Sequence, residues 1–132
     1  MEMEKPATPP PQQQLLVIWV LWAAFLGGSF VQFHFLHSKT PSPPDGTQTW
    51  MAGLAPVAAS MFIRWSLLPR VAAMQPALVL MIIGMALAES AMFFGIFFFN
   101  AHQTELFVAA VIGLAQHAPV YAKRLVTSPP KQ

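Results

Sequence analysis

Long apolar runs alternate with short polar segments along this chain. Four of the runs are each about as long as a bilayer requires, because a helix needs ~20 residues to cross about 30 Å of hydrocarbon. The pattern predicts four transmembrane helices, over residues 15–36, 50–68, 76–99 and 105–121. The first and third runs are apolar apart from single polar residues. The second includes Arg64, and the fourth includes Gln116 and His117.

The segments between and beyond the runs are polar and rich in proline. Residues 1–14 have the composition of a disordered or polyproline-like tail, and residues 123–132 form a polar C-terminal tail. The link at residues 100–104 is so short that the third and fourth helices must be antiparallel neighbours. The sequence therefore predicts one all-α transmembrane domain over residues 15–122, flanked by two tails.

A cleaved signal peptide is the alternative for the first run. The apolar core of a signal peptide has about 7–15 residues and ends at small residues. Here the run is longer, and Phe33, His34 and Phe35 occupy the expected exit. We expect a retained transmembrane helix.

Composition supports a lipid environment and excludes several classes of protein. The chain has 132 residues, of which 55% are hydrophobic and only 9% are charged, whereas a soluble domain carries about 25% charge. It has no cysteine, which excludes disulfides and thiolate metal sites. Its net charge of +2 is too small to indicate nucleic-acid binding.

The basic residues predict the orientation. With four spans, six of the seven Lys and Arg residues fall on one side, and Lys39 alone falls on the other. Cytoplasmic segments are enriched in Lys and Arg, so both termini are predicted to be cytoplasmic. The expected location is the bacterial inner (cytoplasmic) membrane. The six residues are Lys5, Arg64, Arg70, Lys123, Arg124 and Lys131.

Small residues suggest how the helices pack. Gly84, Ala88, Ala91 and Gly95 fall within about 60° of arc on the third helix. Small residues allow close backbone approach in membranes, so this stripe is predicted to be a helix-packing seam. It can serve packing within the bundle or a homo-oligomer interface.

Glu89 is the one acidic residue deep inside a predicted span, near the bilayer midplane. An ionised carboxylate there costs several kcal/mol, so it must be protonated, paired, or face water or an ion. Candidate polar partners are Arg64 and His117, the latter with its neighbour Gln116, although Arg64 can also extend to the interface. Ser90 can bond its own helix or help to coordinate an ion.

Other polar residues are dispersed. His34 and His37 share a helix face, but no nearby carboxylate completes a metal or haem site. No cluster of His, Asp or Ser residues suits catalysis. We predict no cofactor, no metal and no enzymatic activity.

The third helix resembles a known one. The segment from Gln75-Pro76 through Glu89-Ser90 to Gly95 is similar to the carboxylate-bearing helix of ATP synthase c subunits. The resemblance covers about 25 residues and implies that Glu89 carries H⁺ or Na⁺, with Ser90 matching the hydroxyl of sodium-type members. The whole chain more loosely resembles uncharacterised bacterial four-helix membrane proteins.

Two functions follow from these patterns. The first is a small integral membrane protein that acts as an accessory or assembly partner in a membrane complex, or as a homo-oligomer. The second is proton or sodium handling through Glu89. Labelling with a hydrophobic carbodiimide and the oligomeric state in detergent would separate them.

Overall fold

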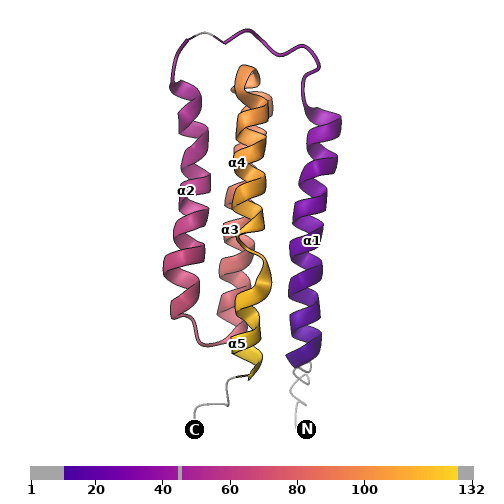
Figure 1. The fold of residues 1–132 in the computed structure, drawn as a ribbon, viewed down its shortest axis with the longest axis vertical. Helices are drawn as coiled ribbons and strands as arrows, with labels where there is room; N and C mark the ends of the chain where they lie inside the picture. Colours follow the sequence, from indigo (N-terminus) through magenta and orange to yellow (C-terminus); the bar gives the residue numbers. More distant parts are fainter. Residues whose placement is uncertain (1–10, 45, 128–132) are drawn as a thin grey trace, which may run out of the picture.

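A computed structural model describes residues 11–44 and 46–127, and all regular structure within them is helical. Four long helical segments run side by side along the bundle (Figure 1). The first is α1 (Pro11–Leu36). The second joins η1 (Thr49–Leu54), α2 (Ala55–Phe62), η2 (Ile63–Leu67) and η3 (Leu68–Arg70). The third is α3 (Met74–Phe97). The fourth joins η4 (Asn100–His102), α4 (Gln103–Ala115), η5 (Pro119–Tyr121) and α5 (Ala122–Thr127).

All four segments are long and apolar enough to cross a membrane: Gln12–Leu36, Thr49–Arg70, Met74–Phe97 and Asn100–Val126. This confirms the predicted all-helical architecture with four membrane-length helices. The start of α1 and the end of α5 lie at the same end of the bundle (Figure 1). We call it the terminal end, and the opposite end the loop end.

Helices α1 and α5 both extend into segments that were predicted to be tails. Helix α1 begins at Pro11, so only residues 1–10 of the predicted N-terminal tail remain, and these lie outside the described residues. At the other end, α5 extends the fourth segment to Thr127, and residues 128–132 lie outside the description. Residues 123–127 of the predicted C-terminal tail therefore belong to α5.

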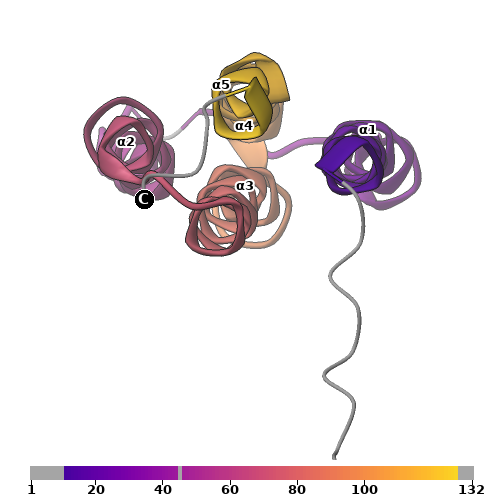
Figure 2. The same ribbon diagram turned by 90° about the horizontal axis from the view of Figure 1, so that it is seen from below.

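Helices α3 and α4 meet at the centre, with α2 on one side and α1 on the other (Figure 2). The predicted stripe of Gly84, Ala88, Ala91 and Gly95 is buried. A Cβ added at Gly95 would lie 3.0 Å from the Cα of Gln103, and one added at Gly113 would lie 2.8 Å from the Cβ of Ala88. The stripe therefore brings the α3 and α4 backbones together inside the bundle.

Helix α1 packs less deeply than the others. In its most apolar window 11% of residues are buried, against 44% in the fourth segment. Aromatic contact holds its loop end, where the rings of Phe33 and Phe107 stack with centroids 4.0 Å apart. The Gln103 side chain adds two bonds to Ser38, accepting from its N–H at 2.9 Å and donating to its carbonyl at 2.8 Å. Much of the remaining α1 surface faces outward.

Candidate functional site

The Glu89 carboxyl lies between α3 and α1. Its Oε1 is 3.1 Å from the hydroxyl of Ser29, a wholly buried residue, and that hydroxyl is also 2.9 Å from the carbonyl of Phe25. One hydroxyl hydrogen serves one acceptor well at a time. A protonated Glu89 satisfies both contacts, because it can donate to Ser29 while Ser29 donates to Phe25. The geometry thus suits a protonated carboxyl.

A cleft of about 290 Å³ opens from this carboxyl to the outer surface of the bundle. Small residues of α1, Ala24 and Gly28, make room for it. The carbonyl oxygen of the Gln32 side chain, which also lines the cleft, is buried and has no hydrogen-bond partner among the described residues. The Glu89 cleft therefore combines a carboxyl with an unused amide oxygen. Its lining consists of Leu21, Ala24, Phe25, Gly28, Gln32 and Glu89.

Ser90, the other predicted ion ligand, is directed elsewhere. Its hydroxyl donates to the carbonyl of Leu87 in its own helix at 2.6 Å. The sequence left two roles open for Ser90, a bond to its own helix and coordination of an ion, and the structure has the bond to its own helix. The hydroxyl beside Glu89 is supplied by Ser29 of α1, a residue the sequence reasoning did not single out.

His117 belongs to a second polar cluster. It is wholly buried, and its Nε2 lies 2.8 Å from the hydroxyl of Ser60 in α2. The ring lies against Gly84 of α3, where an added Cβ would lie 2.7 Å from Nε2 and overlap Cε1. The absence of a side chain at Gly84 is therefore what admits the imidazole.

The fourth segment breaks next to this histidine. Pro119 has no N–H, and Ala118 is extended, with φ −48° and ψ 127°. In a continuous helix the N–H of Val120 would bond to the carbonyl of Gln116. Here it bonds to Ala118 at 2.7 Å. The break leaves the Gln116 carbonyl without its helical donor.

Side chains from two other helices satisfy the carbonyls around the break. The Nε of Arg64 donates to the Gln116 carbonyl at 2.6 Å, and the indole of Trp22 donates to the Leu114 carbonyl at 2.9 Å. Because irregular backbone at membrane depth persists only where it is shielded and bonded, these two contacts make the break tolerable.

Arg64 is placed by a π-helical turn, η2, which follows α2. Such turns are frequent at functional sites. Its guanidinium lies 4.8 Å from the Trp65 ring centroid and 4.9 Å from that of Tyr121. Trp65 in turn donates to the side-chain oxygen of Gln116 at 2.9 Å. Arg64, predicted either to extend to the interface or to approach Glu89, joins η2 to the α4 break.

The structure does not bring Arg64 or His117 to Glu89. Gly84, which contacts the histidine ring, and Glu89 differ by five positions, which is about 140° around α3. Among the described residues, no hydrogen bond or ion pair joins Glu89 to either residue. The two polar groups thus occupy opposite faces of α3.

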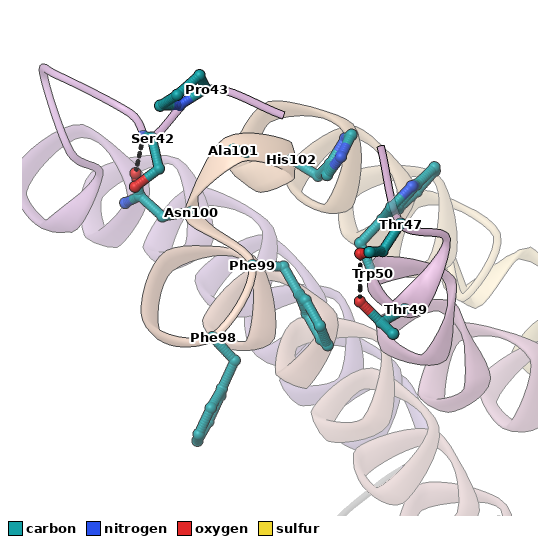
Figure 3. A pocket seen from close by; sticks show the side chains of 10 residues that line it. All are labelled: Ser42, Pro43, Thr47, Thr49, Trp50, Phe98, Phe99, Asn100, Ala101 and His102. Atoms are coloured by element: carbon teal, nitrogen blue, oxygen red, sulfur yellow. Dashed lines mark hydrogen bonds between the residues drawn. The ribbon is translucent and has the colours of Figure 1, made fainter. Parts of the chain in front are cut away.

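A further pocket of about 230 Å³ lies at the loop end (Figure 3). Trp50 stacks on His102 with centroids 4.6 Å apart, and the Ser42 N–H donates to the Asn100 side chain at 3.0 Å. Within the part of the chain that the structure describes, no group of three or more His, Asp or Glu residues could hold a metal ion. His37 instead makes a 2.6 Å contact with the carbonyl of Phe33, and His34 is exposed.

The helices and the two polar groups define a small polytopic bundle with the character of an integral membrane protein. Comparison with protein-family models, curated proteins and solved structures found no match.

Proposed function

We propose that this protein is an accessory or assembly subunit of a membrane complex, and that a transmembrane helix of another subunit docks on α1. The observation that carries the proposal is the open face formed by Ala23, Ala24, Gly27 and Gly28, here called the α1 small-residue face. A Cβ added at Gly27 would have no neighbour within 4 Å. By contrast, each glycine of α3 and α4 has a close neighbour across a helix interface.

This contrast has a physical meaning in lipid. Apolar side chains gain little from leaving lipid for another helix, so association depends on close backbone approach and interhelical hydrogen bonds. Small residues at four-residue spacing, such as Ala23 and Gly27, are useful where a second backbone can come close. Glu89, at the edge of the neighbouring cleft, supplies a polar group for a helix seated there.

The proposal includes an orientation and a location. Arg64, Arg70, Lys123 and Arg124 belong to the terminal end, while Lys39 belongs to the loop end. An excess of basic residues marks cytoplasmic segments. We therefore assign both termini to the cytoplasm of a bacterial cell and the bundle to its inner membrane.

A photo-crosslinking residue at Gly27 tests the docking face in native membranes. We expect a discrete protein adduct at Gly27 and none at Ala86, an exposed small residue of α3. Native mass spectrometry of the purified adduct gives the partner's mass, which distinguishes a second copy from a different protein. Gly27→Leu should weaken the complex at least about tenfold, because a bulky side chain keeps the backbones apart. The Ala86→Leu variant, which places the same side chain at another exposed position, should leave it intact. Equal effects of both would refute docking on α1.

Proton or sodium handling through Glu89 is the second candidate. It is favoured by the oxygens of Glu89, Ser29 and Gln32 around one cleft. The resemblance of the third helix to that of ATP synthase c subunits supports the same interpretation. In this function the cleft would give the carboxyl access to an exchanging ion.

A hydrophobic carbodiimide distinguishes the second candidate, because it reacts with protonated carboxyls in apolar surroundings. We expect intact-protein mass spectrometry to show one adduct, which disappears in Glu89→Gln. The control is Glu105, an exposed carboxyl in the first turn of α4, and the adduct should persist in Glu105→Gln. Sodium should slow labelling several-fold if the cleft binds it. Failure to label Glu89, with unchanged ion flux in Glu89→Gln vesicles, would exclude this function.

A further inference from the structure

Arg64 forms no ion pair with the residues that the structure describes. The described residues at the terminal end include Arg64, Arg70 and Arg124, and the two described carboxyls lie elsewhere: Glu89 faces α1, and Glu105 stands in the first turn of α4 at the loop end. Arg124 is close enough to Arg64 for the two to repel each other electrostatically. A partly buried guanidinium without an ion-pair partner favours binding of an anion.

The position of the Arg64 side chain suits binding of an anion. Its only hydrogen bond among the described residues is donated by Nε to the Gln116 carbonyl, and the flanking rings of Trp65 and Tyr121 hold the group in place. The two Nη groups therefore have no protein acceptor in the described structure. A guanidinium fixed in this way presents a forked pair of donors that matches phosphate.

The residues around Arg64 add unused polar atoms. The hydroxyl of Tyr121 and the side-chain nitrogen of Gln116 are both buried without a hydrogen-bond partner among the described residues. The Tyr121 ring centroid lies 4.9 Å from the Arg64 guanidinium. The backbone carbonyl of Gln116 accepts a hydrogen bond from Arg64.

The surroundings identify the source of the anion as lipid. Trp65, whose ring centroid lies 4.8 Å from the guanidinium, is 62% exposed, so an apolar side chain flanks Arg64 on the outer surface. Arg64 stands six residues before Arg70, about 9 Å along a helix, which is within reach of the headgroup region for a long side chain. We propose that Arg64 binds the phosphate of an anionic phospholipid at the junction of η2 with the α4 break.

Native mass spectrometry of the full chain in detergent tests this site. The probes are phosphatidylglycerol, phosphatidylcholine and inorganic phosphate. We expect phosphatidylglycerol to bind, and Arg64→Gln to weaken it at least about fivefold, as expected for one arginine near a membrane surface. Arg70→Gln, which removes the same charge from an exposed residue of η3, should weaken binding less than Arg64→Gln does, because the donor fork of Arg64 is held between two rings.

The outcomes separate a site from general charge attraction. Equal losses in the two variants, or equal binding of phosphatidylcholine, would overturn the proposal. Displacement of the lipid by inorganic phosphate would overturn the assignment to lipid. If Arg64→Gln does not fold, Arg64→Lys carries the test, because lysine keeps the charge and loses the fork. Undiminished phosphatidylglycerol binding by a folded Arg64→Lys protein would then refute the proposal.

Discussion

Replacing Gly84 by alanine is expected to destabilise the bundle by about 3 kcal/mol, through overpacking and loss of a buried hydrogen bond. The new methyl group would overlap the His117 ring, which has no room to move because the residue is wholly buried. To make space, the imidazole must leave Ser60, whose hydroxyl it contacts at 2.8 Å. Reversible unfolding in mixed detergent and SDS micelles, followed by tryptophan fluorescence, measures the change.

Gly27→Ala is the matched control for this prediction. Because a Cβ at Gly27 meets nothing within 4 Å, the same substitution there should not destabilise the isolated protein, and helix propensity can stabilise it by up to about 1 kcal/mol. Alanine also has the higher helix propensity of the two residues, which affects both variants alike. Equal effects at Gly84 and Gly27 would show that the histidine does not depend on the missing side chain.

A substitution of His117 tests whether the imidazole causes the destabilisation by Gly84→Ala. In a His117→Ala background the imidazole is gone, so Gly84→Ala should cost little or become stabilising by filling part of the cavity. The double-mutant cycle should therefore give a coupling of about 3 kcal/mol. Additive effects would mean that the Gly84 methyl clashes with something other than the histidine.

The helices could be predicted from the sequence because their cause is local. Each apolar run of membrane length must form a helix to satisfy its own backbone in lipid. The third helix is found at Met74–Phe97, within two residues of the predicted 76–99 at either end. The fourth could not be predicted as closely. Pro119 indicated a kink, but where the chain resumes as α5 depends on contacts with other helices.

The partner of Glu89 could be predicted only in part. Glu89 lies about 130° around the helix from the small-residue stripe, which places it outside the helix-packing seam. Which residue it meets depends on the rotation of α1, and a helix that is apolar all round carries no pattern to define that rotation. Ser29 and Gln32 were the available signal, because they are two polar residues three positions apart in an otherwise apolar stretch.

The role of Arg64 was not predictable from spacing. A π-helical turn shifts the direction of every following side chain relative to an α-helix, and η2 begins one residue before Arg64. The sequence offers no residue type that specifies such a turn. Ser60 and Arg64 stand four positions apart in the sequence, and both reach the stretch around Gln116 and His117.

Removing the Pro119 break should make Arg64 far less important for folding. In the native protein, Arg64→Met is expected to cost about 2 kcal/mol, because the Gln116 carbonyl loses its donor within the bundle. Alanine at position 119 restores an N–H and permits a continuous helix, in which Val120 donates to Gln116. In the Pro119→Ala background, Arg64→Met should therefore cost less than about 1 kcal/mol.

The cycle formed by these variants is measured by the same SDS titration, with circular dichroism reporting any gain in helix. Ser66→Ala, a partly buried residue on the same π-helical turn, controls for disturbance of η2. Strict additivity of Arg64→Met and Pro119→Ala would contradict the interpretation that Arg64 compensates for the break. A positive coupling would show that an arginine of one helix makes a proline break in its neighbour tolerable. The same contact fixes the guanidinium where a lipid phosphate can reach it.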